Sequence, residues 1–327
     1  MRILFTIGTV VIGLVSTFFL PFSAESNAQS QNNKKGVFVA VGYGGRRMKS
    51  TDGKTWKITA EWAQPGKDDK NNLMGLVHAE GKFVAVGGGG GGKTGGGHIL
   101  VSLDGVKWKH VYEAKNRINP IIYGKGRFVV GGPRRQLLWS EDGEKWNLGA
   151  KIEEKVATHF RHGVFGNGVF VLVGNHGGGG PPYWCAVSPD GESISHVRTD
   201  MPSIRSIAFG AGRFVIVGEG GVRISSTDGK SWHKHHADKS ENFRWVLWTG
   251  KTFLAGGGKN VYSSGNGQEW GLTKLTFRGS PKWTDGQRFI STSWPGRMYF
   301  SADGKMWEKS PPLTANGINK VVFGVLP

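Results

Sequence analysis

Short hydrophobic runs bounded by glycine recur along the chain and predict β-strands. One such phrase occurs seven times, with GKFVAVG from Gly81, GVFVLVG from Gly168 and GRFVIVG from Gly212 as examples. A Val/Ile/Phe run of about five residues between glycines is typical of a strand. Comparable runs precede and follow each phrase, so each repeating unit is expected to hold four short antiparallel strands joined by hairpins.

A second phrase, Ser-x-Asp-Gly-x-x-Trp, follows these runs and fixes their period. Its seven copies begin at Ser50, Ser102, Ser140, Ser188, Ser226, Ser264 and Ser301. Two copies are degenerate, because Ile194 replaces the Trp of the fourth and Asn266 replaces the Asp of the sixth. Successive Asp positions, counting Asn266, are 52, 38, 48, 38, 38 and 37 residues apart, which indicates a repeat architecture.

The units predict an all-β fold, a seven-bladed β-propeller of four-stranded antiparallel blades. The first unit starts at VFVAVG without a first strand of its own. The sequence ends with INKVVFG from Ile318, which has the first-strand pattern and no second strand after it. We therefore expect this C-terminal strand to pair into the N-terminal blade and close the ring, which removes open sheet edges.

The repeated phrases resemble the Asp boxes of BNR-repeat propellers in the sialidase-like superfamily, over residues 36–327. The resemblance implies that each box forms the turn between the third and fourth strands, away from the ligand face. Side chains of Asp and Ser satisfy the N–H groups of such a turn, Gly takes a positive φ, and Trp packs against the neighbouring blade. The box aspartates are therefore interpreted as turn residues and not as catalytic acids or metal ligands: Asp52, Asp104, Asp142, Asp190, Asp228 and Asp303.

The N-terminal segment has the pattern of a secretory signal peptide. Arg2 precedes an apolar run, and a small-residue stretch ends at Ala28. We expect a signal peptide at 1–28, a linker at 29–35 and a single propeller domain at 36–327, in a secreted or periplasmic protein. An uncleaved membrane anchor is the alternative. The single cysteine, Cys185, excludes an internal disulfide framework.

The net charge of +18 favours anionic partners. Acidic glycans and acidic protein surfaces are the expected partners, whereas nucleic acid is not, because the chain is expected to be exported and carries no recognised nucleic-acid motif. No cofactor or metal is expected, and the protein is expected to be a monomer. The Walker-like GGGGGGKT from Gly87 leads into a strand pattern and not a helix, and HKHHADK from His233 is interpreted as a solvated turn.

Three arginines occupy the same place in the first strands of successive units. Counting back four residues from Phe165, Phe209 and Trp248, the aromatic residues that end these strands, gives Arg161, Arg205 and Arg244. Equivalent positions on neighbouring inner strands converge at one mouth of the channel, where guanidinium groups could hold a carboxylate, sulfate or phosphate. Solvent-facing arginines are the alternative interpretation.

Further candidates lie in the loops between second and third strands. Additional anion-binding groups are Arg46, Arg134 and Arg297, and stacking residues for sugar rings are Trp184 and Trp294. Packing of these tryptophans between blades is the alternative.

The leading functional hypothesis is an exported binding or scaffold module for an anionic partner, either an acidic glycan or a protein. A sialidase-like glycoside hydrolase or lyase acting on acidic sugars is one alternative, since sialidases hold the substrate carboxylate with three arginines. The Phe/Tyr-Arg-Ile-Pro phrase of that family is absent, and its catalytic residues are not identifiable in this sequence. An assembly factor for a membrane or envelope complex is the other alternative, by resemblance to Asp-box propellers of that kind.

Overall fold

The computed structural model describes residues 36–62, 71–89, 96–132, 135–153, 155, 159–176, 180–235 and 240–327. The expected signal peptide (1–28) and linker (29–35) lie outside the described residues, as does Arg134. Also outside them are most of the glycine-rich phrase from Gly87 and part of the histidine-rich phrase from His233.

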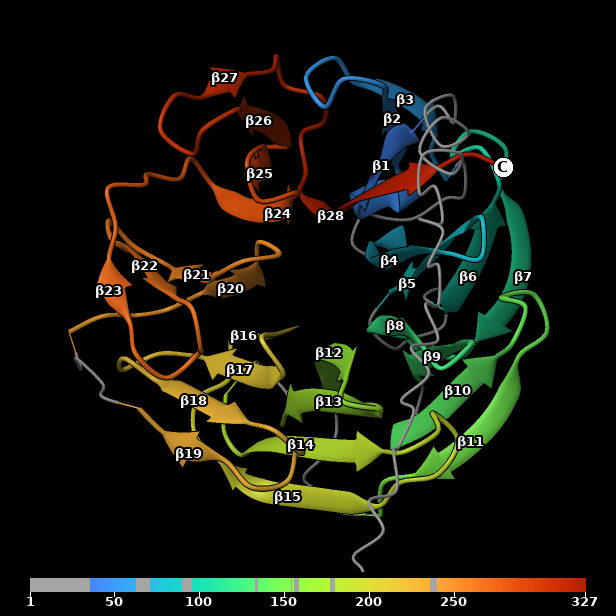
Figure 1. Cartoon of the computed structure of the whole chain (residues 1–327). Coiled ribbons are helices and arrows are strands. Elements are labelled where there is room, and N and C mark those ends of the chain that lie inside the picture. Colours follow the sequence, from blue (N-terminus) through green and yellow to red (C-terminus); the bar gives the residue numbers. More distant parts are fainter. Residues whose placement is uncertain are drawn as a thin grey trace, which may run out of the picture. The chain divides into compact units, whose positions relative to one another are not determined.

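The described residues form seven four-stranded antiparallel sheets arranged as blades around a centre (Figure 1), which confirms the predicted seven-bladed propeller. The first, innermost strands are β28 (Ile318–Val325), β4 (Leu73–Ala79), β8 (Ile121–Gly124), β12 (His159–Gly166), β16 (Ser206–Gly210), β20 (Trp245–Trp248) and β24 (Ser280–Thr284). The second strands are β1 (Gly36–Gly42), β5 (Lys82–Gly88), β9 (Arg127–Gly131), β13 (Val169–Asn175), β17 (Arg213–Val217), β21 (Phe253–Gly256) and β25 (Phe289–Ser293).

The two outer strands of each blade are shorter in several blades. The third strands are β2 (Arg47–Ser50), β6 (Gly97–Ser102), β10 (Gln136–Ser140), β14 (Tyr183–Ser188), β18 (Arg223–Ser226), β22 (Val261–Ser264) and β26 (Arg297–Ser301). The fourth strands are β3 (Lys57–Ala60), β7 (Lys109–Ala114), β11 (Asn147–Lys151), β15 (His196–Met201), β19 (His233–Lys234), β23 (Gly271–Leu272) and β27 (Glu308–Lys309). One short 3₁₀ turn, η1 (Tyr43–Gly45), follows β1. No helix among the described residues is long and apolar enough to span a membrane.

Strand β28, from the C-terminal end of the sequence, completes the first blade as predicted. It pairs antiparallel with β1, with Phe38 opposite Phe323 and Gly36 opposite Val325. The blade therefore joins the two ends of the propeller domain, and each of the seven blades has its full set of four strands.

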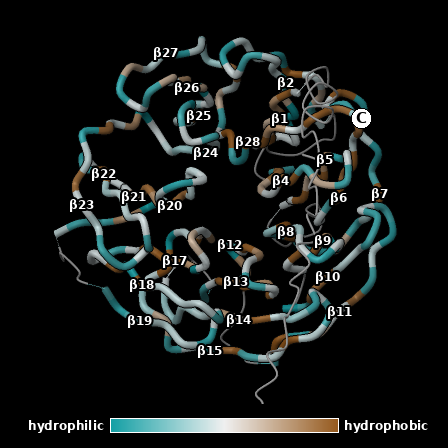
Figure 2. The backbone as a smooth tube through the Cα atoms, in the orientation of Figure 1, coloured by the Kyte–Doolittle hydropathy of each residue, from teal (hydrophilic) through white to brown (hydrophobic). Residues whose placement is uncertain are grey.

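The second strands are buried because both of their faces pack against neighbouring blades. In β13 the side chains of Phe170, Leu172 and Val173 have no exposed surface. Val171 and Val173 join Phe214 and Ile216 of the next blade in one hydrophobic cluster, so the core consists of successive layers between blades. Figure 2 shows hydrophobic positions recurring in the inner strands, while hydrophilic positions are frequent along the outer rim.

Each Ser-x-Asp-Gly phrase forms the turn between third and fourth strands. Its Ser and Asp side chains accept hydrogen bonds from backbone N–H groups of the same turn. In the first copy, Asp52 Oδ1 accepts hydrogen bonds from the backbone N–H groups of Lys54 and Thr55, both at 2.8 Å. The hydroxyl of Ser50 accepts from the N–H of Gly53 at 2.9 Å and donates to Asp52. The interpretation of the aspartates as turn residues is confirmed by these contacts, which recur in the other copies.

The box glycines are required by both conformation and space. All seven have φ between 72° and 82°, where a side chain is disfavoured. A Cβ on Gly229 would lie 2.5 Å from Val171 Cγ2 on the preceding blade. Each box therefore also docks against the blade before it.

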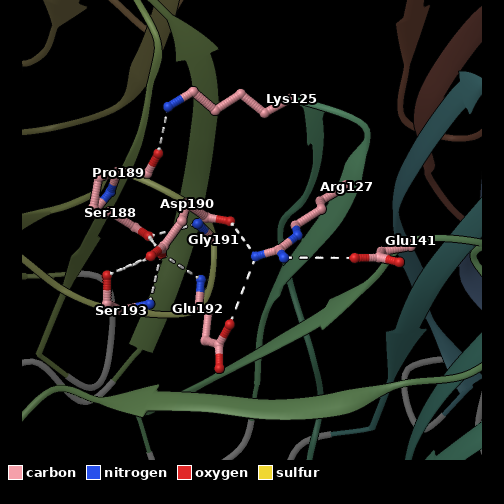
Figure 3. A network of polar contacts seen from close by, with 9 residues as sticks. All are labelled: Lys125, Arg127, Glu141, Ser188, Pro189, Asp190, Gly191, Glu192 and Ser193. Carbon is pink, nitrogen blue, oxygen red and sulfur yellow. Dashed lines mark hydrogen bonds and ion pairs between the residues drawn. The ribbon is translucent and has the colours of Figure 1, made fainter.

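Polar contacts strengthen this docking. Figure 3 shows the fourth box, where Arg127 of the third blade donates to the carbonyl oxygen of Asp190 at 3.2 Å and pairs with Glu141 and Glu192. Lys125 donates to the carbonyl oxygen of Pro189 at 2.9 Å.

The box tryptophans pack between blades, as expected. Trp56 donates from Nε1 to the carbonyl oxygen of Gly53 at 3.0 Å and clusters with Ile290 and Phe300 of the seventh blade. The two degenerate copies keep the same turn. Ile194 joins the hydrophobic cluster at its position, and Asn266 Oδ1 accepts from two N–H groups as the aspartates do.

Candidate functional site

The centre of the propeller contains a cavity of about 770 Å³ that is lined by residues of all seven inner strands. Because strands alternate in direction, the inner strands begin on the face opposite the Asp-box turns. The start of each inner strand and the loops between second and third strands therefore share one face.

Arg161, Arg205 and Arg244 all line this cavity. Arg161 belongs to β12, while Arg205 and Arg244 directly precede β16 and β20. Arg161 and Arg205 are half-buried and Arg244 is exposed. The pairing of β12 with β13 shifts register between Phe160 and His162, so Arg161 occupies an irregular, bulged position. Such bulges redirect a side chain relative to the regular alternation of the strand.

Local contacts hold two of the three guanidinium groups. Arg161 donates from Nε to Asn175 Oδ1 at 2.9 Å. Burial, and then the positive charges of Arg117 and Arg205, lower the pKa of Arg161 from its usual value. Arg205 pairs with Glu219, donating from Nη2 to Oε1 at 2.5 Å. Arg161 and Arg205 are therefore close enough for their like charges to interact.

The other inner strands have neutral residues at the corresponding level, and two of these residues tie blades together. Asn119 donates to the carbonyl oxygen of Arg161 at 2.7 Å. Asn319 donates to the carbonyl oxygen of Leu73 at 2.7 Å. At these two positions, where the fourth to sixth blades have arginine, the asparagine amide therefore links its own inner strand to the backbone of the next one.

Positively charged residues of five adjacent blades, from the fourth round to the first, line the cavity. Two lysines that the sequence reasoning did not single out, Lys282 and Lys320, line it together with the three arginines. No Asp or Glu is among the described residues that line it, and the lining residues of the second and third blades are uncharged. The cavity is therefore suited to anions.

Burial, together with neighbouring positive charges at two of them, lowers the pKa values of three groups inside the cavity. Burial, with a smaller effect of Lys320, lowers the pKa of Lys282 to about 8. Burial among the inner strands also lowers the pKa of Lys320, although the residue keeps exposed surface. Burial, with smaller effects of Lys320, Lys282 and Arg161, lowers the pKa of His162 to about 3. His162 is therefore neutral at physiological pH.

The additional arginines proposed from sequence lie outside this cavity lining. Arg46 donates to the carbonyl oxygen of Tyr43 at 3.1 Å and lies 3.5 Å from a carboxylate oxygen of Glu61. Arg297 donates to the carbonyl oxygen of Ser310 at 3.2 Å. Arg134 lies outside the described residues.

The two stacking candidates differ completely in exposure. Trp184 has no exposed surface and packs edge-on against Phe160, with ring centroids 5.1 Å apart. The expectation that Trp184 stacks on a ligand is wrong, because its ring is part of the core between the third and fourth blades. Trp294 is 63% exposed, and among the described aromatic pairs it forms one T-shaped contact, with Tyr43. Trp294 therefore stays a candidate.

A second cavity of about 370 Å³ adjoins Arg244, and its lining includes Glu241 and Lys259. Glu241 accepts a hydrogen bond from the hydroxyl of Tyr262 at 3.0 Å. A Tyr–carboxylate pair is what the glycosidase alternative requires. Tyr262, however, is not among the described residues lining either cavity, so its hydroxyl is not presented to a ligand there.

The histidine-rich phrase contributes a structural contact where it is described. His235 and Ser225 are joined by a hydrogen bond of 2.8 Å, and Ser225 is fully buried. In the described part of the chain, no group of three or more His, Cys, Asp or Glu side chains could hold a metal ion.

Comparison with protein-family models and with curated proteins finds no match, so the resemblance to Asp-box propellers rests on the motif and the fold. Several solved structures share the fold. YCF48 from Cyanidioschyzon merolae has 14% identity, with 78% of this chain and 95% of that chain covered and a TM-score of 0.56. YCF48 bound to D1 peptide has 15% identity, with 73% and 81% covered and a TM-score of 0.54. Apo AztD from Citrobacter koseri has 13% identity, with 85% and 82% covered and a TM-score of 0.51.

Proposed function

We propose that this protein is a binding and assembly module that holds an acidic segment of a partner protein at the arginine-lined mouth of its channel. One observation carries the proposal. Arg161, Arg205 and Arg244 line a single cavity, and no carboxylate is among its described lining residues.

The chemistry of arginine supports this partner class. A guanidinium group binds carboxylates through paired hydrogen bonds, and its charge persists at any physiological pH. The net charge of +18 adds long-range attraction for an acidic partner. A propeller of the same fold, YCF48, was solved with a peptide bound, which supports a peptide segment as the kind of partner.

The proposed place of action is outside the cytoplasm, in a secreted or periplasmic setting. It rests on the signal-peptide pattern of residues 1–28. Partners would then be envelope or extracellular proteins, and the module would assist their assembly by holding an acidic segment.

Binding of a labelled acidic peptide tests the proposal. A fluorescein-labelled peptide of about ten residues, rich in Glu and Asp, is compared with its Gln/Asn counterpart by fluorescence anisotropy at low salt. We expect the acidic peptide to bind and the neutral one not to bind. The triple variant Arg161→Ala, Arg205→Ala, Arg244→Ala should weaken binding at least about 30-fold, because charged hydrogen bonds are lost.

A matched triple variant controls for net charge. Lys107→Ala, Lys230→Ala and Lys305→Ala remove the same charge from exposed positions in the Asp-box turns, on the opposite face. Equal loss in both triple variants would refute a specific site at the channel mouth. A heparin oligosaccharide in the same assay separates the glycan alternative, since tighter binding of heparin than of the peptide would contradict a protein partner.

A further inference from the structure

Two lysines inside the channel are not used by the proposed peptide site. Lys282 lies on β24 and Lys320 on β28, inner strands of the seventh and first blades. The pairing of β24 with β25 shifts register between Pro281 and Trp283, so Lys282 occupies a bulge. Both residues line the cavity of about 770 Å³.

Lys282 and Lys320 lie on neighbouring inner strands and line the same cavity, and no carboxylate is among its described lining residues. The positive charge of Lys320 contributes to the lowered pKa of Lys282, and both contribute to the lowered pKa of His162 on the opposite blade. Within the part of the chain that the structure describes, neither ammonium group has a hydrogen-bond or ion-pair partner. An anion between them would relieve their repulsion and replace the solvation that the strands restrict.

The channel wall becomes apolar toward the Asp-box face. Beyond the lysines the lining includes Leu247 and Val322, and the inner strands of the third to seventh blades then contribute a set of aromatic residues. These are Tyr123, Phe165, Phe209, Trp248 and Trp283. From Arg161 to Phe165 the strand advances four residues, about 13 Å at 3.3 Å per residue. The cavity is therefore cationic at one end and aromatic at the other.

We propose that the channel binds a small organic anion with an apolar body, its charged group between Lys282 and Lys320 and its body against the aliphatic and aromatic lining. The volume lies within the range of small-molecule sites, about 300–1,000 Å³. The proposal differs from the peptide site in the residues it uses, because it relies on the lysines and the apolar wall and not on the arginines at the mouth of the same cavity.

Calorimetric titration with sodium octanoate tests this ligand class. We expect octanoate to bind one site per chain and acetate to bind at least about 30-fold more weakly, since each buried methylene strengthens binding about fourfold. Octyltrimethylammonium, which has an alkyl tail of similar length and the opposite charge, should not bind. Equal affinities for acetate and octanoate would overturn the apolar part of the proposal, and equal affinities for octanoate and octyltrimethylammonium would overturn the ionic part.

Lysine variants locate the site. Lys282→Met and Lys320→Met should each weaken octanoate binding at least about tenfold, and Lys282→Arg should restore most of it. Lys309→Met, on the exposed outer strand β27 of the seventh blade, is the matched control and should bind as the unsubstituted protein does. Unchanged affinity in both channel variants would overturn the proposal.

The pH dependence of octanoate affinity tests the proposal in the unsubstituted protein. This test applies even if a lysine variant fails to fold. Because the pKa of Lys282 is about 8, octanoate affinity should be constant below pH 7 and fall as pH rises through 8. With one linked proton the fall approaches tenfold per pH unit. Lys282→Arg should shift the fall to higher pH, where Lys320, whose pKa is also lowered by burial, remains to titrate. A flat profile from pH 6 to 9.5 overturns the role of Lys282. If the triple arginine variant still binds octanoate but no longer binds the acidic peptide, the small-anion site in the channel is distinguished from the peptide site at its mouth.

Discussion

Arg205 donates two hydrogen bonds to the same carboxylate oxygen of Glu219, from Nε at 3.1 Å and from Nη2 at 2.5 Å. One of the three arginines at the channel mouth is therefore engaged by a carboxylate of its own blade. An incoming anion has to share or displace Glu219. The affinity of the channel mouth for an anion therefore depends on displacing Glu219 as well as on the positive charge of the arginines.

Replacing Glu219 is expected to strengthen binding of the acidic peptide. In Glu219→Gln the negative charge is lost while an amide of the same shape remains. Because exposed ion pairs contribute about 0.2–1 kcal/mol, we expect two- to fivefold tighter binding at low salt. Anisotropy titration measures the change, which should disappear at high ionic strength. Glu144→Gln removes an equivalent exposed pair, with Lys109, and should leave affinity unchanged; weaker binding in Glu219→Gln would contradict the competition.

Two glycines with the same backbone conformation are expected to differ in their tolerance of alanine. Gly212 has φ 68° with nothing within 4 Å of an added Cβ, whereas a Cβ on Gly229, with φ 73°, meets Val171 at 2.5 Å. Gly212→Ala should lower the free energy of unfolding by about 1–2 kcal/mol from backbone strain alone. Gly229→Ala adds a clash between blades and should lower it by at least about 1 kcal/mol more. Urea unfolding measures both, and equal losses would show that the box turn moves freely away from the preceding blade.

The Asp boxes are expected to make stability depend on pH in acid. At Asp52 and Asp228 burial opposes ionisation, but hydrogen bonds from the turn outweigh it and lower the pKa to about 2. Since the unfolded value is about 3.9, the ionised form stabilises the fold above pH 4, and this contribution is lost as pH falls toward 2. Thermal unfolding between pH 7 and pH 2.5 should show this decline.

Asparagine is expected to remove part of that dependence. Asn266 forms the same turn in the sixth blade, so the double variant Asp52→Asn, Asp228→Asn should fold at pH 7 and lose less stability between pH 5 and pH 2.5. The alanine pair at the same positions serves as the control and should be less stable at every pH, because turn N–H groups lose their acceptors. A decline in the asparagine variant as steep as in the unsubstituted protein would assign acid sensitivity to other groups.

The two tryptophans are expected to affect different properties. Trp184→Ala should lower the free energy of unfolding by about 3–5 kcal/mol, because a fully buried ring is removed. Trp294→Ala should change it by less than about 0.5 kcal/mol. If Trp294 contacts the partner, binding of the peptide or of heparin should weaken in this variant at unchanged stability, as thermal unfolding and anisotropy together would show.

The propeller fold was predictable because the residues that form its turns are adjacent in sequence and recur in every blade. Ser50, Asp52 and Gly53 are adjacent in sequence, so their turn forms the same hydrogen bonds wherever the phrase recurs. The common location of Arg161, Arg205 and Arg244 followed from the same register, since equivalent residues of equivalent strands lie at one level of the ring.

Features set by a single blade were not predictable from the repeat. Lys282 enters the channel through a bulge that exists only as a shift in pairing, which the repeated pattern of strands does not reveal. Trp184 is buried because Gly174, opposite it on β13, leaves room for its ring. The pairing of Arg205 with Glu219 depends on a loop whose path the pattern of strands does not specify.

Completion of the first blade by β28 makes the closed channel depend on a contact between two segments that are far apart in sequence. Residues from Ile318 onward are synthesised after every other strand of the propeller, yet they pair with β1 at its beginning. Contacts between such distant segments form slowly because a long loop must close first. Until they form, β1 presents a bare edge and the channel lacks Asn319 and Lys320. A nascent or proteolytically clipped chain that lacks β28 therefore cannot present the complete anion-binding surface. Anion binding would then distinguish chains with a completed first blade from chains without one.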